Sequence, residues 1–580
     1  MKTSKQIAEE AAIQGVLNCY MKETGNYEGS QDAAVAIPLK HQQLKITADV
    51  KYWSETQRHL FHFPIQCGQE QQQGGIPLDY VTFISLITKE WLLENGREDA
   101  EDEFMLRSIL SARNVKRYVE ERKADSGQLE SDDFSYIEAE QSLLFGHLLH
   151  PVPKSKQGIT EEEEGLYSPE LKGEFPLHYF LAAPEIIQQD SSMDVPAADI
   201  LKQELVNRGV EVPEGRVLLP VHPLQAKELL GRESVKELIK SGDLTDLGEL
   251  GSKFTATSSL RTVYSPHSKW MYKFSVPVKL TNSLRVNKRK ELHRGVEISR
   301  LLDAGLGKEL ADLFPGFSIL RDPAYITIGN GEAESGFEVV IRENPFFEGN
   351  EKGAAVVAGL CQDHAYGGNS RLASIIRKAA SAENRTLEEV SLDWFSRYLM
   401  ITFDPVMWLY ETYGLALEAH QQNGVVRLKD GYPEHFYYRD NQGYYYSQSK
   451  AHKLKQWLPD LSEKSETICE EKVADERLRY YFFYNHLFGV INAFGTAGLI
   501  PESRLLQFLK TRMEEWYASS GKTSKILAGF LSERELPCKA NLLTRFHDMD
   551  ELVGEMAAQS VYTKVPNPIF HSEGSMYDPV

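Results

Sequence analysis

The chain has 580 residues, and its composition of 42% hydrophobic and 26% charged residues is that of an ordinary globular protein. That length exceeds what one hydrophobic core can hold, so we expect roughly two to four domains or lobes. The net charge is −20 and no basic tract occurs, which excludes nucleic acids and anionic membranes as expected partners and requires any positive field to be local.

The cysteines and the N-terminus predict a cytoplasmic protein. Five cysteines lie far apart without a CxxC pair, which favours free thiols in a reducing compartment. The N-terminal stretch MKTSKQIAEEAAIQ carries acidic residues where a signal peptide needs its apolar core. No run approaches the ~18 apolar residues of a membrane span.

Residues 1 to about 150 are expected to be mainly helical, because apolar residues recur at helical spacing. A short strand-like piece, HLFHFPI, interrupts them. We predict a helix over Asp133–Leu149 that ends at the following prolines. His147 and His150 share its face, but zinc would need a third ligand, so His150 is expected to cap the helix or donate to an anion. The acidic run Glu161–Glu164 is expected to be a solvated loop.

The stretch Lys253–Asn287 combines strand periodicity with cationic side chains. From Lys269 onward apolar and polar residues alternate, which predicts one long, half-buried strand. Upstream, SSLRT predicts a second strand with Ser259 and Arg261 on one face, and SPHS supplies the turn. Cations and hydroxyls on a rigid hairpin suit a polyphosphate, although a solvated sheet face would have the same pattern. The polar face of the long strand carries Lys269, Lys273, Lys279, Thr281, Ser283 and Arg285.

The register of this hairpin decides whether its donors can meet one ligand. Ser259, Arg261, Lys273 and Arg285 all have odd numbers, so simple antiparallel pairing brings the two strands' donors to one face only across a loop of odd length. The sequence therefore predicts a loop of roughly three or five residues around SPHS, or a bulge that corrects the register.

A second polar cluster lies in LEAHQQNGVVRLKDGYPEHFYYRDNQG, within a region of mainly helical periodicity. Glu418 and His420 would lie ~200° apart around a helix, so the helix predicted over 390–418 should end there in a turn. Asp440 ends the strand YYRD and could return to meet Glu418. Two carboxylates with Asn423 could hold Mg²⁺ when phosphates complete the octahedron, and two unrelated surface acids are the alternative.

Five stretches, in order, resemble the NRPS-independent siderophore synthetases, the family of the aerobactin synthetases. They are GHLLHPVPKSKQG, LLPVHPLQ, SSLRT with KLTNSLR, LEAHQQN followed by RD, and KANLLTR, and they span residues 146–545. The resemblance implies an α+β fold, often homodimeric, with a helical N-terminal thumb, antiparallel β-rich fingers and a mainly helical, kinase-like palm. From composition we draw the boundaries at 1–170, 171–345 and 346–580.

The resemblance also implies site residues, each at a position that matches a family motif. Those expected to bind ATP are Ser259, Arg261, Thr262, Lys273, Thr281, Gln422 and Asn423. Those expected to bind Mg²⁺ are Glu418 and Asp440. Those expected around the reacting carboxylate are Arg285, His420, His150 and Lys539. The family pattern has a proline after His147, where this chain has Leu148.

The implied reaction is the ATP-dependent condensation of citrate, or a citrate derivative, with an amine or hydroxyl for siderophore biosynthesis. The carboxylate attacks the α-phosphate of ATP, and a polyamine or amino-acid-type amine then displaces AMP. Arg285 is expected to bridge the carboxylate and the α-phosphate, because electrostatic stabilisation is usually the largest catalytic contribution. His420 is expected to have about the right pKa to polarise the second step or to take a proton.

Two other functions remain open from the residues alone. Glu418 and Asn423 are five apart, the spacing of Asp and Asn in a kinase catalytic loop, although no glycine-rich loop precedes the hairpin. A non-catalytic protein that binds citrate or a ferric chelate would need the cations but not the pair Glu418 and Asp440. A ligase of this type releases pyrophosphate and AMP, whereas a kinase releases ADP.

Overall fold

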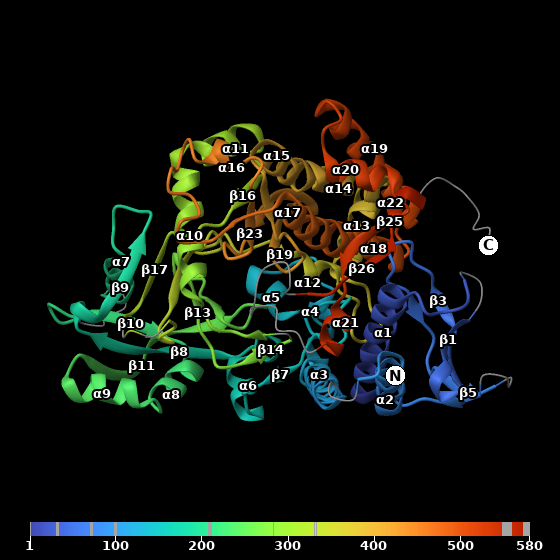
Figure 1. The fold of residues 1–580 in the computed structure, drawn as a ribbon, viewed down its shortest axis with the longest axis horizontal. Coiled ribbons are helices and arrows are strands. Elements are labelled where there is room, and N and C mark those ends of the chain that lie inside the picture. Colours follow the sequence, from blue (N-terminus) through green and yellow to red (C-terminus); the bar gives the residue numbers. More distant parts are fainter. Residues whose placement is uncertain are drawn as a thin grey trace.

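The computed structural model describes residues 2–30, 34–69, 74–97, 101–206, 212–281, 283–329, 331, 333–547 and 560–571. Figure 1 shows the middle of the chain as a sheet-rich lobe on the left and the two ends of the chain together on the right. The mixed, largely antiparallel architecture confirms the predicted α+β class. The predicted boundaries at 170 and 345 stay predictions.

The N-terminal part packs three helices with a small antiparallel sheet. The helices are α1 (Ser4–Thr24), α2 (Tyr80–Asn95) and α3 (Glu101–Glu121). The sheet has the order β1 (Val35–Leu39), β2 (Leu44–Ala48), β5 (Gln66–Gln69) and β6 (Ile76–Pro77). Val16, Ile37 and Phe83 are fully buried in the shared core. Only HLFHFPI had indicated a strand here, because strands of two to five residues are too short to show a clear period.

The helix predicted over Asp133–Leu149 is wrong in its extent. Helix α5 spans only Tyr136–Gln141, because the Ser142 hydroxyl donates to the Ala139 carbonyl at 2.8 Å and the chain leaves the helix there. His147 and His150 therefore lie in an irregular segment and share no helical face.

The acidic run is also not a loop. It forms helix α6 (Glu161–Tyr167), which begins with a capping box at Thr160. Glu164 is buried and bonds to the Tyr118 hydroxyl and to Lys156. The segment was misjudged because its first three glutamates are exposed or half-buried while the fourth faces inward.

The middle of the chain forms an eight-stranded sheet in which every neighbouring pair is antiparallel. Its core includes Phe180, Leu219, Tyr272 and Ile326. The order is β10 (Val217–Val221), β8 (Glu174–Ala182), β11 (Leu244–Ala256), β12 (Thr262–Tyr264), β13 (Trp270–Phe274), β18 (Val339–Glu343), β17 (Ala324–Ile328) and β9 (Ile187–Ser191).

The long strand predicted from Lys269 is broken. Strand β13 ends at Phe274, and Pro277, which lacks a backbone N–H, follows. The chain then enters a separate three-stranded sheet with the order β15 (Ser283–Leu284), β14 (Lys279–Leu280) and β7 (Lys156–Gln157). Thr281, with φ 49°, follows β14 where the chain turns back. The periodicity was continuous, but it spans two sheets.

The predicted register is wrong as well. Thr262 pairs with Lys273, so Arg261, whose carbonyl accepts from the Phe274 N–H at 2.9 Å, is out of phase with Lys273. Arg261 nevertheless reaches the same cavity as Lys273, because it precedes β12. The residue before it, Leu260, has φ 64°, a left-handed conformation that departs from strand geometry.

The C-terminal part is mainly helical and encloses two small sheets. Its helices include α13 (Arg371–Glu383), α14 (Leu387–Ile401), α15 (Phe403–Tyr413), α17 (Glu471–Leu478), α18 (Phe488–Thr496), α19 (Glu502–Ser519) and α20 (Lys525–Ser532). One sheet contains the hairpin of β21 (Gly424–Lys429) and β22 (Tyr432–Tyr438), and the other pairs β20 (Leu415–Leu417) with β23 (Tyr444–Ser447). Helix α15 ends before the predicted residue 418, because Gly414 adopts φ 70° at its C-cap.

The last part of the chain returns to the first. Strand β25 (Glu535–Lys539) pairs with β26 (Tyr562–Pro566), and helix α21 (Asn541–Phe546) follows β25. Leu542 and Phe546 belong to the N-terminal core, where Phe546 stacks on Trp91 with ring centroids 4.6 Å apart. Figure 1 shows α21 beside α3 and α1.

All five cysteines are free, as the sequence predicted, and all five are buried. Among the described residues, no helix is both long and apolar enough to cross a membrane.

Candidate active site

One cavity of about 420 Å³ brings together all of the predicted site residues. Segments from the N-terminal, middle and C-terminal parts of the chain line it. The predicted residues among its lining are His150, Ser259, Arg261, Thr262, Lys273, Thr281, Arg285, Glu418, His420, Gln422, Asn423, Asp440 and Lys539.

The lining of the cavity is strongly cationic. It includes 13 lysines and arginines but only four acidic residues, in a chain whose net charge is −20. Low-dielectric walls with one sign of charge focus the field and favour a ligand of the opposite charge. The cavity therefore suits a polyanion, or two anions held side by side.

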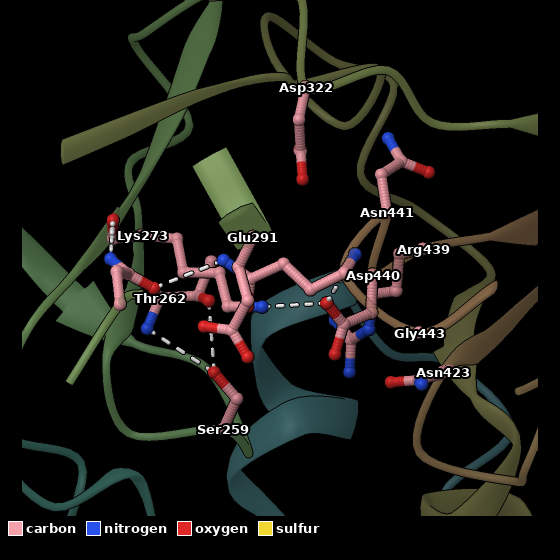
Figure 2. Close-up of polar contacts among 12 residues, drawn as sticks. Ser259, Thr262, Lys273, Glu291, Asp322, Asn423, Arg439, Asp440, Asn441 and Gly443 are labelled. Carbon is pink, nitrogen blue, oxygen red and sulfur yellow. Dashed lines mark hydrogen bonds and ion pairs between the residues drawn. The ribbon is translucent and has the colours of Figure 1, made fainter. Parts of the chain in front are cut away.

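The loop before β12 presents hydroxyl groups to the cavity. Ser259 and Thr262 join through their hydroxyls at 2.9 Å, and the Thr262 N–H donates to the Ser259 hydroxyl at 3.2 Å (Figure 2). Leu260, between them, has φ 64°. A non-glycine residue in this region persists only where its surroundings hold it, and such residues cluster at ligand sites.

Arg261 is held by two buried amide side chains. Its guanidinium donates to Asn287 Oδ1 at 2.8 Å and to Gln442 Oε1 at 3.1 Å. Burial lowers the pKa of Arg261 to about 10, so the side chain remains cationic at neutral pH. Both hydrogen-bond partners are neutral, although the carboxylates of Glu291 and Asp440 lie near enough to raise the pKa of Arg261 against the effect of burial.

Lys273 and Asp440 form an ion pair across the cavity, with Nζ 2.6 Å from Oδ1 (Figure 2). Burial lowers the pKa of Lys273 to about 8, although Asp440 opposes this. Burial alone would raise the pKa of Asp440, but Lys273 and Arg342 together hold it well below its usual range. Asp440 also has φ 86°, another non-glycine residue in the left-handed region.

Arg342 adds a second cation beside this pair. It lines the cavity from β18 and donates to both oxygens of Asp322, at 2.6 and 2.8 Å. Both side chains are buried. The planar fork of Arg342 is thus fixed in place next to Asp440.

Glu418 lies between β20 and the turn that leads to β21 and is half-buried. It accepts from the Tyr445 hydroxyl at 2.7 Å, and its carbonyl accepts from Asn423 Nδ2 at 3.1 Å. Burial raises the pKa of Glu418, and the negative charge of Asp440 raises it further. A divalent cation would relieve that repulsion.

The residues present fit Mg²⁺ better than zinc. Magnesium takes one or two carboxylates plus phosphate oxygens and water, which matches Glu418 and Asp440. Among the described residues, no group of three or more His, Cys, Asp or Glu side chains could hold a metal by itself. His147 and His150, with ring centroids 6.0 Å apart, each accept a backbone N–H at Nδ1, at 3.1 Å.

Arg285 and Thr281 lie on the hairpin of β14 and β15. The Arg285 guanidinium donates to the Thr281 hydroxyl at 3.3 Å and to the Leu280 carbonyl at 3.4 Å. Arg107, from α3, in turn donates to the Thr281 carbonyl at 3.3 Å. The hairpin is therefore anchored from outside the cavity.

His420 differs from the sequence prediction in its pKa. Burial, with a contribution from His147, lowers the pKa to about 3, so the imidazole is neutral at physiological pH. Its Nδ1 accepts from the Gln422 N–H at 3.2 Å, which puts the ring proton on Nε2. His420 is therefore suited to donate a hydrogen bond, and the predicted near-neutral pKa was wrong.

His150, from the N-terminal part of the chain, and Lys539, from the C-terminal part, are the last two predicted residues of the cavity lining. His150 is 5% exposed, and its ring does not cap a helix. Lys539 lies at the end of β25 with its ammonium 5.5 Å from the ring centroid of Tyr480 and 5.6 Å from that of Tyr481. The aromatic faces favour the charged form of Lys539.

Several lining cations were not singled out from the sequence. Arg342 lies in β18, VVIRE, where one arginine among buried apolar residues was an available signal. Arg439 stood next to Asp440 in the RD pair. Arg477, in α17, looked like an ordinary helix-surface residue, yet it is buried and lines the cavity.

Two family models match the chain. The IucA/IucC family matches residues 135–362, and a family described as ferric iron reductase FhuF-like transporter matches residues 392–554. The first match contains the hydroxyl loop and the β14–β15 hairpin, and the second contains Glu418, Asp440 and Lys539.

Relatives and solved structures cover almost the whole chain. A spermidine-citrate ligase of Bacillus anthracis is 45% identical over 98% of this chain and 99% of its own. The rhizobactin siderophore biosynthesis protein RhbC of Rhizobium meliloti is 35% identical, with 98% of each chain covered. The structure of ATP-bound aerobactin synthetase IucA from Klebsiella pneumoniae has a TM-score of 0.88 at 27% identity and covers 96% of this chain and 99% of its own. These matches confirm the resemblance that the motifs indicated: the chain belongs to the IucA/IucC family of siderophore synthetases.

Proposed function

We propose that this protein, a ligase of siderophore biosynthesis, uses ATP to adenylate a carboxylate of citrate or a citrate derivative and then transfers the acyl group to an amine or hydroxyl. The observation that carries this proposal is the single cavity with 13 cationic side chains in an acidic chain. ATP and citrate are both polyanions, and the first half-reaction requires them to touch. A site for one small neutral substrate would not need this field.

In the first half-reaction, a citrate oxygen attacks the α-phosphorus and pyrophosphate leaves. Ser259, Thr262 and Lys273 would bind the phosphates. Arg261, which Asn287 and Gln442 hold in position by hydrogen bonds, would bind them as well. Arg285 would contact both the attacking carboxylate and the α-phosphate, which otherwise repel each other. Mg²⁺, held by Glu418 and Asp440, would neutralise charge on the phosphates.

In the second half-reaction, a neutral amine attacks the acyl carbon and AMP leaves. Negative charge then collects on the acyl oxygen. The neutral His420 imidazole, with its proton on Nε2, would donate to that oxygen rather than take a proton from the amine. The proton that the amine loses would pass to the phosphate of the departing AMP. Lys539, charged over two tyrosine rings, would hold a remaining citrate carboxylate.

The relatives support the substrate classes. One relative is named a spermidine-citrate ligase, another an L-2,3-diaminopropanoate–citrate ligase, and the solved IucA structure holds ATP. We therefore propose ATP as cosubstrate, a citrate-type acid as acceptor of AMP, and a polyamine or amino-acid-type amine as nucleophile. The predicted homodimer and the cytoplasmic location belong to the same proposal.

Hydroxylamine trapping tests the function directly. The protein is incubated with ATP, Mg²⁺ and hydroxylamine and with each member of a panel of carboxylic acids, and hydroxamate, AMP and ADP are measured. Citrate or a citryl monoamide should give hydroxamate with equimolar AMP. ADP in place of AMP would favour the kinase-like alternative. Binding of citrate without nucleotide turnover for any acid would favour a non-catalytic binder.

A further inference from the structure

Glu140 is a buried carboxylate behind the cavity, and it contacts both the hydroxyl loop at Ser258 and the segment that carries Asp440. Glu140 lies at the end of α5 and is 1% exposed. Its Oε2 accepts from the Ser258 N–H at 2.8 Å. Its two oxygens also accept from the Arg439 guanidinium, at 2.6 and 3.2 Å. Glu140 is not among the described residues that line the cavity.

Arg439 is fixed from several directions and does not depend on solvent. It is buried, and it donates to the Tyr136 hydroxyl at 2.8 Å and to the Gln422 carbonyl at 2.8 and 3.0 Å. A further contact of 3.3 Å joins it to the Ser258 hydroxyl. Glu140 provides the charge that balances this buried guanidinium. Because desolvation offsets most of the attraction in a buried ion pair, the pair fixes the geometry of these side chains more than it adds stability.

The two partners of Glu140 are each adjacent in sequence to a proposed site residue. Ser258 precedes Ser259 in the hydroxyl loop, and Arg439 precedes Asp440, the candidate metal ligand. Gln422 closes the arrangement, since its Nε2 donates to the Ser258 carbonyl at 2.9 Å. Glu140 therefore links two segments that are 181 residues apart in the chain and have no strand pairing between them.

We propose that Glu140 is a positioning residue that, with Arg439, sets the distance between the hydroxyl loop at Ser259 and the carboxylate of Asp440. This rests on the proposed function, in which the loop binds the phosphates and Asp440 binds their metal ion. Such a site must hold its groups to about 0.5 Å for full activity, and the groups behind the binding residues provide that precision. Glu140 touches neither substrate nor metal.

The test compares Glu140→Gln with a matched ion pair away from the cavity. Gln keeps the size of the side chain, but its amide nitrogen must face one of the two donors. Asp404→Asn is the control: Asp404 is 7% exposed, joins α15 to α19 through Arg512, and lies outside the described cavity lining. The Kd for ATP with Mg²⁺ is measured by calorimetry, the KM for citrate by pyrophosphate release, and the thermal unfolding midpoint by fluorescence.

We expect Glu140→Gln to raise the Kd for ATP about tenfold and to change the KM for citrate less than twofold. Asp404→Asn should lower the unfolding midpoint without changing the Kd. Arg439→Lys, which keeps the charge and loses the fork, should reproduce the effect on ATP if Glu140→Gln does not fold. An unchanged Kd in the folded variant, or equal changes in Kd and KM, would overturn the inference. Wild-type protein that binds no ATP would instead overturn the proposed function.

Discussion

Lys273 Nζ lies 2.6 Å from Asp440 Oδ1, so the candidate phosphate-binding cation and the candidate metal ligand neutralise each other. The pair is asymmetric, because the lysine side chain is 3% exposed and the aspartate side chain 31%. Asp440 can therefore turn toward a metal ion in the cavity, while Lys273 has little room to move. Nucleotide and metal would have to separate this pair or share it.

The affinity for ATP should fall as the pH rises through the pKa of Lys273. Burial lowers that pKa to about 8, so Lys273 is charged below about pH 8 and loses its charge above it. Phosphate favours the ammonium, so ATP binding should take up protons in this range. Calorimetry in two buffers of different ionisation enthalpy, at about pH 7.5 and about pH 9, measures both effects.

Lys273→Arg provides the control for this prediction. An arginine stays charged over the whole range, so the variant should lose the proton uptake and most of the pH dependence. If both proteins show the same dependence, another group titrates and Lys273 does not contact phosphate.

Asp440→Asn should weaken the Mg²⁺-dependent step. The change keeps the size of the side chain but removes its charge, and it leaves Lys273 without its counter-charge. We expect pyrophosphate release to fall by ~10²-fold or more and its Mg²⁺ dependence to shift to higher concentration. Near-normal release at low Mg²⁺ would show that Asp440 is not a ligand. Circular dichroism checks that the fold is retained.

Arg285→Lys and His420→Ala should separate the two half-reactions. Lysine loses the planar fork that would contact carboxylate and α-phosphate together, so Arg285→Lys should lose ~10²–10³ in citrate-dependent pyrophosphate release. His420→Ala should keep part of that release but form little amide, even with excess amine. Equal loss of both steps in both variants would contradict this division of roles.

How far the site could be predicted depended on whether its residues were local in sequence. Glu418, His420 and Asn423 lie within one turn, and Asp440 follows the hairpin of β21 and β22, so their approach could be inferred. The register of Lys273 could not, because the left-handed backbone at Leu260 and the sheet change after Phe274 leave periodicity intact.

The pKa of His420 and the role of Glu140 could not be predicted from sequence patterns, for a related reason. Both depend on burial by segments far away in the chain: His147 contributes to the pKa of His420, and Glu140 meets a partner 299 residues away. A glutamate in the middle of the helix predicted over Asp133–Leu149 looks like a solvated residue until its neighbours are known. Tertiary contacts, not local propensity, decide such residues.

Glu23 should make stability depend on pH through a contact between the two ends of the chain. It accepts from the Leu542 and Leu543 N–H groups at 2.9 Å each, and it is 6% exposed. Burial raises its pKa to about 7 against the opposing effect of these donors and of Lys22. Cys19, Cys538 and Lys539 lie around the same contact.

The direction in which stability changes with pH follows from the raised pKa of Glu23. The favourable contribution of Glu23 is fully present below its unfolded pKa of 4.5 and is lost as the pH rises through about 7. Glu23→Gln stays neutral, so the variant should gain stability relative to wild type between about pH 5 and about pH 8, by up to roughly 3 kcal/mol. Thermal unfolding midpoints at several pH values measure the difference. Glu9→Gln removes a half-buried carboxylate from the same helix and is the control for the loss of one charge. Parallel curves for both variants would refute the assignment.

The return of α21 to the N-terminal core has a consequence for synthesis of the protein. Leu542 and Phe546 pack with residues from the first quarter of the chain, and Lys539 lies on a strand whose partner is β26. Until β26 has been synthesised, β25 lacks its pairing strand, so Lys539 has no fixed place in the cavity lining. A chain truncated before Glu535 would keep the other 12 lysines and arginines of the cavity lining and lack Lys539, the residue proposed to hold a citrate carboxylate.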